Sequence, residues 1–232
     1  MTSYNACNAL AALFDLDGVL IDSEATYTEI WEDIDRRFPT GIANFALRIK
    51  GTTLPDILST YYPDLEMRSE VVELLKKSED DMAYPLFDGV IDFLDELKAN
   101  DIPAAIVTSS NARKMERLFA SLPGFRDYFG AVITDADVTH SKPHPEGYLS
   151  AAGRLGRNPG RHCFVFEDSL AGLAAGNAAG ASVIALSTTN PADMLAGRAH
   201  RVIGSFREFS VSEMSDMAAR AACVINRTGS MI

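Results

Sequence analysis

The stretch LAALFDLDG, residues 10–18, is a short apolar run that ends in two acidic residues and a glycine. Its apolar part, residues 10–14, is too short for a helix and predicts a buried β-strand. Asp15 and Asp17 follow two residues apart, so a continued strand geometry would point both carboxylates the same way. Gly18 allows a backbone path that is closed to other residues. The stretch therefore predicts a strand that brings two carboxylates to one edge of a sheet.

The same pattern recurs along the chain. Further short apolar runs that end in polar or acidic residues lie at 104–107, 131–133, 163–166 and 182–186. Helical patterns separate most of them, at 88–99, 112–121, 145–156 and 170–179. Strands that alternate with helices predict right-handed crossovers and a parallel sheet, which is an α/β fold with a Rossmann-like core. Ligands bind beyond the carboxyl ends of such strands, so we expect the polar residues that end these runs to gather there.

One segment breaks the alternation. Residues 24–86 have no strand-like run and show helical patterns at 24–38, 42–49, 54–62 and 66–82. Prolines and glycines mark turns between these patterns. We therefore expect a helical cap domain, residues 24–86, inserted into a core domain of residues 1–23 and 87–232, and we expect the cap to cover the active edge.

Polar residues follow the other predicted strands. Thr108 and Ser109 precede a helix, where a hydroxyl and free N–H groups can bind an anion; plain helix capping is the alternative. Glu167 and Asp168 end another strand, and an acidic first turn of the next helix is the alternative. Lys142 lies in a loop stiffened by two prolines, which favours a positioned charge over surface decoration.

If these carboxylates lie close together as predicted, a cation is needed to offset their negative charge. Like charges at close range need a metal ion or a shared proton. Carboxylate oxygens are hard ligands and favour magnesium. Mg²⁺ is therefore the predicted cofactor.

The overall charge limits the partners. The formal net charge of -11 repels nucleic acid and anionic membranes, so neither is expected to bind. The three cysteines, Cys7, Cys163 and Cys223, are widely spaced and form neither a disulfide framework nor a zinc pattern. No apolar run approaches the length of a membrane span. We expect a cytoplasmic monomer whose partner is a small molecule.

Four motifs in a fixed order resemble the haloacid dehalogenase superfamily, in its β-phosphoglucomutase-like and sugar-phosphatase branch with a helical cap. The motifs are DLDGVLIDSE at residues 15–24, the Thr108-Ser109 step, SKPHPE at residues 141–146 and FEDSLAG at residues 166–172. They span most of the chain, and the helical insert matches the cap of this branch in place and size.

The resemblance implies a role for each matching residue. Asp15 would attack phosphorus and form an aspartyl-phosphate, while Asp17 would protonate the leaving oxygen and later deprotonate water. Thr108 and the Ser109 N–H would bind the phosphoryl oxygens, and Lys142 would neutralise charge. The implied Mg²⁺ ligands are Asp15, the carbonyl oxygen of Asp17, Glu167 and Asp168. Such positioning and charge neutralisation are what phosphoryl transfer needs.

Departures from the family pattern narrow the range of activities that the resemblance implies. An acid at Asp17 argues against dehalogenation. Tyr27 stands where β-phosphoglucomutases usually carry a histidine, and Leu54 stands where they carry an arginine for a second phosphate. We therefore predict a magnesium-dependent phosphatase of a small phosphorylated metabolite, with a sugar phosphate as the leading substrate class. A hexose-phosphate mutase is the enzymatic alternative, and a sugar-phosphate sensor is the non-enzymatic one.

The cap offers candidate substrate contacts. Glu24 ends the first motif, and Lys50, Thr52 and Thr53 lie near the turn around Gly51. A plain turn between two cap helices, with Lys50 solvated, is the alternative role for the last three.

Overall fold

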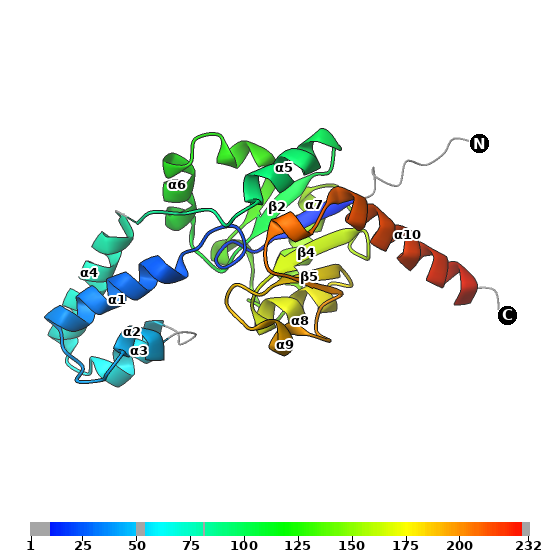
Figure 1. Ribbon diagram of the computed structural model, residues 1–232. Coiled ribbons are helices and arrows are strands. Elements are labelled where there is room, and N and C mark those ends of the chain that lie inside the picture. Colours follow the sequence, from blue (N-terminus) through cyan, green and yellow to red (C-terminus); the bar gives the residue numbers. More distant parts are fainter. Residues whose placement is uncertain (1–9, 50–53, 81, 229–232) are drawn as a thin grey trace. The chain divides into compact units, whose positions relative to one another are not determined.

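The computed structural model describes residues 10–49, 54–80 and 82–228. It divides into two compact units, of which one is the segment Asp22–Pro85 and the other contains the chain before and after it (Figure 1). The unit Asp22–Pro85 is helical, and the other unit contains a β-sheet. The predicted limits of the cap domain, residues 24 and 86, remain a prediction.

The larger unit confirms the predicted α/β fold. Its sheet has six parallel strands in the order β3-β2-β1-β4-β5-β6. The strands are β1 Ala11–Phe14, β2 Ala104–Val107, β3 Phe129–Ile133, β4 Cys163–Glu167, β5 Ser182–Leu186 and β6 Arg201–Ile203. The order reverses at β1, which lies between β2 and β4, so the carboxyl end of β1 is the point at which such sheets bind ligands.

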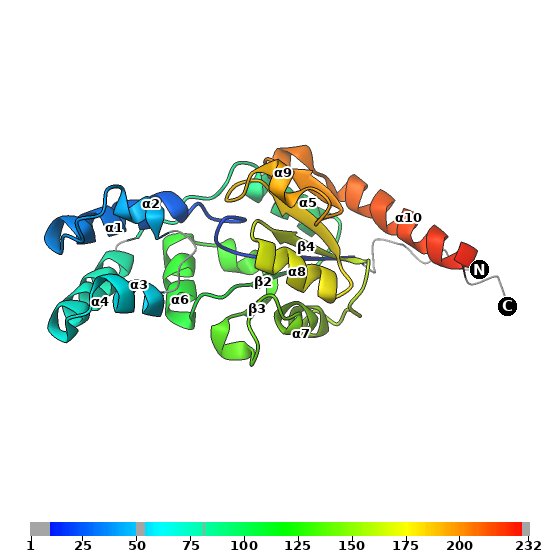
Figure 2. The ribbon, with the colours of Figure 1, turned by 90° about the horizontal axis from the view of Figure 1, so that it is seen from below.

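Helices cover both faces of the sheet, with α7 and α8 on one side and α5 on the other (Figure 2). The helices of this unit are α5 Val90–Ala99, α6 Ala112–Ser121, α7 Glu146–Arg154, α8 Leu170–Ala178, α9 Ala192–Leu195 and α10 Val211–Thr228. Side chains of β1 alternate between the two faces. Leu13 joins a buried cluster with α7 and α8, while the Phe14 ring meets the Phe93 ring of α5 at 6.2 Å.

An aromatic cluster supports the strand that carries the first motif. Phe14 stacks on Phe166 of β4 with 4.7 Å between ring centroids, and Phe93 stacks on Phe206 at 5.2 Å. Phe14 and Phe166 are fully buried. Because each ring precedes a site residue, Asp15 or Glu167, this packing fixes the strand ends from which the site is built.

The helical unit contains α1 Glu24–Arg37, α2 Phe45–Arg48, α3 Leu54–Tyr61 and α4 Leu65–Asp80. It has its own buried cluster, which includes Trp31, Ile34, Phe45 and Val71. The predicted helices at 24–38, 54–62 and 66–82 correspond closely to α1, α3 and α4, whereas the pattern at 42–49 yields only the short α2.

Besides the four-residue α9 and the short 3₁₀ turns, two elements of the sheet unit had no counterpart in the sequence interpretation. Edge strand β6 has three residues and an exposed Arg201, so it lacks the apolar run that marks the other strands. The other element is α10, whose Met214 and Ala218 are buried. Within the described ranges, no helix combines the length and apolar character that crossing a membrane requires.

Candidate active site

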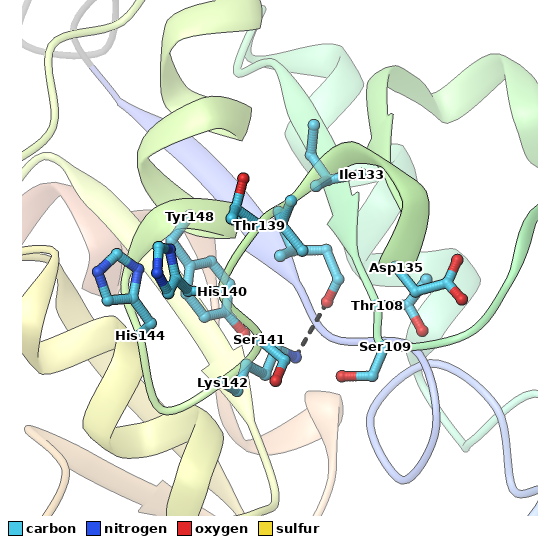
Figure 3. Close-up of a pocket in the computed structure, with 13 residues that line it drawn as sticks. Thr108, Ser109, Ile133, Asp135, Thr139, His140, Ser141, Lys142, His144 and Tyr148 are labelled. Atoms are coloured by element: carbon cyan, nitrogen blue, oxygen red, sulfur yellow. Dashed lines mark hydrogen bonds between the residues drawn. The ribbon is translucent and has the colours of Figure 1, made fainter.

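Lys142 joins the ends of three strands. Its Nζ lies 2.5 Å from Asp15 Oδ1, beyond β1, and 2.6 Å from Glu167 Oε1 at the end of β4. It also donates to the carbonyl oxygen of Val107 at the end of β2, at 3.0 Å (Figure 3). Asp15 continues the parallel pairing, because its N–H donates to the carbonyl of Phe166 at 3.0 Å. The lysine that the sequence placed in a rigid loop therefore lies at the centre of the carboxyl edge.

Three carboxylates meet around this lysine. Oxygen atoms of Asp15, Glu167 and Asp168 lie within 4.8 Å of one another. These residues are 9%, 0% and 4% exposed. Burial raises the pKa of Asp15 well above its ordinary value, Lys142 opposes this, and Glu167 and Asp168 raise it further. Burial and Glu167 together raise the pKa of Asp168 to about 6.

This donor set fits a divalent cation. Crowded, buried carboxylates are hard to ionise unless positive charge is added. Lys142 supplies one such charge: burial works against its protonated form, but Asp15 and Glu167 outweigh burial and raise its pKa. The cluster offers only oxygen ligands, which favours Mg²⁺ over softer metals. Asp15 and Asp168, with Glu167 beside them, are the residues that could hold the ion.

Glu167 is held by donors on both of its oxygens. Oε1 accepts from the Tyr148 hydroxyl at 2.7 Å and faces Lys142. Oε2 accepts from the N–H groups of Asp168 and Ser169, both at 3.2 Å, and from Ser169 Oγ at 3.0 Å. A carboxylate has about four lone-pair positions, so these donors leave little capacity for a direct metal bond. Glu167 is therefore better placed to orient Lys142 than to dominate the ion's coordination.

Thr108 and Ser109 lie in a pocket with Lys142 (Figure 3). Thr108 follows β2, and its N–H donates to the carbonyl of Ile133 at 2.9 Å. Its Oγ1 accepts from Ser110 N–H at 3.0 Å, which tightens the turn that leads into α6. Hydroxyls and a lysine that line one pocket at a strand–helix turn make an arrangement that can bind an anion.

Asp17 is engaged by residues that the sequence analysis did not single out. Lys114 Nζ lies 2.6 Å from Asp17 Oδ1, and Ser110 Oγ donates to Oδ2 at 3.0 Å. The Tyr148 contact with Glu167 was also missed. Lys114 and Ser110 could have been found from the predicted helix start at the active edge, since Lys114 lies in the first turn of this helix and Ser110 precedes it. Tyr148 carried no such signal, because its position depends on how α7 packs.

The predicted site residues thus fall into three groups. Asp15, Lys142, Glu167 and Asp168 are in mutual contact or close range, and Thr108 and Ser109 share a pocket with Lys142. Asp17 has separate partners on and next to α6. Of the candidate cap contacts, Glu24 begins α1, but its side chain is not described. Lys50, Thr52 and Thr53 lie outside the described residues.

Comparison with known proteins shows the family to which this chain is similar. Residues 10–180 match the family model of the haloacid dehalogenase-like hydrolases. Validoxylamine A 7'-phosphate phosphatase of Streptomyces hygroscopicus subsp. limoneus is 33% identical over 192 residues, which cover 80% of this chain and 89% of that protein. Bifunctional riboflavin kinase/FMN phosphatase of Arabidopsis thaliana is 27% identical over 92% of this chain, which spans 58% of that longer protein.

A solved structure gives the same result at the level of the fold. The crystal structure of a family IA, variant 3 HAD hydrolase from Entamoeba histolytica superposes with a TM-score of 0.76 at 25% identity, covering 90% of this chain and 99% of that one. The family model alone spans well over half of the residues. The chain therefore belongs to the haloacid dehalogenase-like hydrolase family and is an enzyme of that family.

Proposed function

We propose that this enzyme is a magnesium-dependent phosphatase of a small phosphorylated metabolite, with a sugar phosphate as the leading substrate class. The observation that carries the proposal is Asp15, a buried carboxylate 2.5 Å from Lys142 and within 4.8 Å of Glu167 and Asp168. The relatives whose names state phosphatase activities on validoxylamine A 7'-phosphate and FMN support the same class of reaction.

In the proposed reaction, Asp15 attacks phosphorus while the ester P–O bond breaks. Asp17 gives its proton to the leaving oxygen, and the products are the free alcohol and an aspartyl-phosphate on Asp15. Water then attacks phosphorus, the Asp15–phosphorus bond breaks, and Asp17 takes the proton from water. Dividing the transfer in this way replaces one difficult step by two easier ones.

The other residues hold the phosphoryl group during both steps. Lys142, Thr108 and Ser109 would bind its oxygens, and Glu167 keeps Lys142 oriented through their 2.6 Å contact. Asp15 and Asp168 would hold Mg²⁺, with the Asp17 carbonyl as a further ligand and Glu167 beside them, and the ion would neutralise charge on the transferring group. The roles of Glu24, Lys50, Thr52 and Thr53 in substrate contact stay predictions of the same proposal.

A screen of phosphorylated metabolites tests the proposal. We expect inorganic phosphate release that requires Mg²⁺ and falls by about a thousandfold or more in Asp15→Asn. The matched control is Asp127→Asn, because Asp127 is an exposed carboxylate that lies just before the start of β3. This variant should keep wild-type activity. An active Asp15→Asn protein, shown by mass spectrometry to be free of deamidation, would contradict nucleophilic catalysis.

Product analysis separates the alternatives. With β-glucose 1-phosphate and a trace of the bisphosphate, net phosphate release supports the phosphatase, whereas quantitative isomerisation supports a mutase. Binding of one metabolite without turnover of any in the panel would support the sensor instead.

A further inference from the structure

The Asp17 carboxylate has a donor on each oxygen. Lys114 Nζ lies 2.6 Å from Oδ1, and Ser110 Oγ donates to Oδ2 at 3.0 Å. The Lys114 side chain is 13% exposed although Asp17 itself is 32% exposed. A lysine that is largely withdrawn from water loses hydration and rotamer freedom, so its contact with Asp17 is a specific arrangement rather than a solvated surface pair.

Local structure fixes both donors. Asn111 caps α6, and its side-chain oxygen accepts from Lys114 N–H at 3.0 Å, which sets Lys114 in the first turn. Ser110 N–H donates to Thr108 Oγ1 at 3.0 Å, so Ser110 belongs to the turn that carries the phosphate-binding residues. The strand–helix turn after β2 therefore presents two donors to a carboxylate that follows β1.

The placement of Lys114 runs against helix electrostatics. The first turn of a helix carries partial positive charge and favours acidic residues, not a lysine. Among residues 112–115 of α6 there is no acidic residue to offset this. The ion pair with Asp17 supplies the compensating interaction, and local rules broken in this way are typical of functional positions.

We propose that Lys114 is a positioning residue for Asp17, with Ser110 as the second support. The inference rests on the proposed phosphatase function, in which Asp17 delivers a proton to the leaving oxygen and later removes one from water. Both transfers need the carboxylate within hydrogen-bond reach of the reacting oxygen. Two fixed donors on Asp17 limit its rotation and hold it at one orientation between the two steps.

Kinetics of Lys114→Met test the role. General acid–base catalysis contributes about 10²–10⁴-fold, so loss of positioning should lower kcat by about tenfold to a hundredfold with KM little changed. Lys114→Arg, which keeps the charge and the donors, should restore part of kcat, and Ser110→Ala should show a smaller loss. Lys98→Met is the matched control, because Lys98 is an exposed lysine on α5 whose Nζ lies over the Tyr128 ring.

The leaving group gives a second readout. An alkyl phosphate needs protonation of its leaving oxygen more than p-nitrophenyl phosphate does. If Lys114 acts on proton transfer through Asp17, Lys114→Met should slow the first chemical step of alkyl phosphate hydrolysis more than that of the aryl ester. With the aryl ester, Lys114→Met should still form the aspartyl-phosphate quickly but hydrolyse it slowly, because attack by water needs Asp17 as the base. Rapid mixing should then show a burst of nitrophenol.

A double-mutant cycle decides whether Lys114 acts through Asp17. In the Asp17→Asn background, Lys114→Met should cause no further loss, because the group that it positions is already inactive. Fully additive losses, or a raised KM with unchanged kcat, would overturn the proposal and make Lys114 a substrate-binding residue. If Lys114→Met fails to fold by circular dichroism, Lys114→Gln takes its place in the same cycle.

The two proposals fail in different ways. If the wild-type protein releases phosphate and Asp15→Asn does not, while both Lys114 variants behave like wild type, only the positioning role is refuted. If the wild-type protein releases no phosphate from any substrate in the presence of Mg²⁺, the phosphatase function fails and the positioning role falls with it.

Discussion

Asp168 is a carboxylate that its surroundings make harder to ionise. Burial and the neighbouring Glu167 raise its pKa to about 6, from an ordinary value of 3.8. The same environment raises the pKa of Asp15. Since a metal ligand must be deprotonated, protons compete with the ion at both residues.

This competition predicts how Mg²⁺ affinity depends on pH. At pH 7, Asp168 is mostly ionised and available; at pH 5 it is mostly protonated in the metal-free enzyme, and the affinity should be weaker by about tenfold or more. Calorimetric titration with MgCl₂ at pH 5, 6 and 7 measures the change, and runs in two buffers of different ionisation enthalpy count the protons released. An affinity that is equal at pH 5 and pH 7, with no proton release, would contradict the competition between protons and Mg²⁺ at Asp168 and Asp15.

Some contacts between individual site residues could be predicted from the sequence and others could not, for a physical reason. Asp15, Glu167 and Asp168 follow parallel strands, and parallel pairing brings strand ends together whatever the surrounding side chains are. Lys114 and Tyr148 reach the site from α6 and α7 instead. Their contacts depend on the rotation of each helix against the sheet, which packing of many residues sets together and which no short motif records.

The start of α8 is built around the Glu167 carboxylate. Ser169 caps the helix, accepting from Gly172 N–H at 3.0 Å, and also donates to Glu167. A Cβ at Gly172 would lie 1.8 Å from Glu167 Cδ. Glycine at 172 is therefore required by the close approach of helix and carboxylate.

The burial of each strand explains why the sequence predicted some strands and missed another. The strands β1, β2, β4 and β5 are buried along their whole length, so each appears in the sequence as an uninterrupted apolar run. The edge strand β6 is only partly buried and leaves no such run.

Gly172→Ala should destabilise the protein despite the better helix propensity of alanine. Alanine gains about 1 kcal/mol in a helix interior, but overpacking typically costs about 1–3 kcal/mol, and here the clash is with a side chain held by donors from four other residues. Gly153→Ala in α7 is the matched control, since a Cβ there meets nothing within 4 Å. Thermal melts should show a lower Tm for Gly172→Ala and an equal or higher Tm for Gly153→Ala. Equal melting of both variants would show that Glu167 can move aside freely.

At the scale of the whole molecule, the two compact units have separate cores. The sheet unit buries a cluster that includes Leu13, Val165 and Leu173. The unit Asp22–Pro85 buries a cluster of its own side chains around Ile34. A unit of roughly 60 residues buries a smaller fraction of its surface than a larger one, so its own core stabilises it less.

We therefore predict that the helical unit unfolds at a lower urea concentration than the sheet unit. Trp31 is the single tryptophan of the chain and is 7% exposed within the helical cluster, so its fluorescence reports on that unit. Hydrogen exchange of β1 and β4 amides, followed by mass spectrometry, reports on the sheet. Ile34→Ala should weaken the helical unit by about 2–5 kcal/mol and shift the Trp31 transition alone, whereas Val165→Ala, also fully buried, should shift the exchange of the strands alone. If both probes change together in the wild type and in each variant, the two cores unfold as one cooperative unit, and their separation in the folded structure does not extend to their stability.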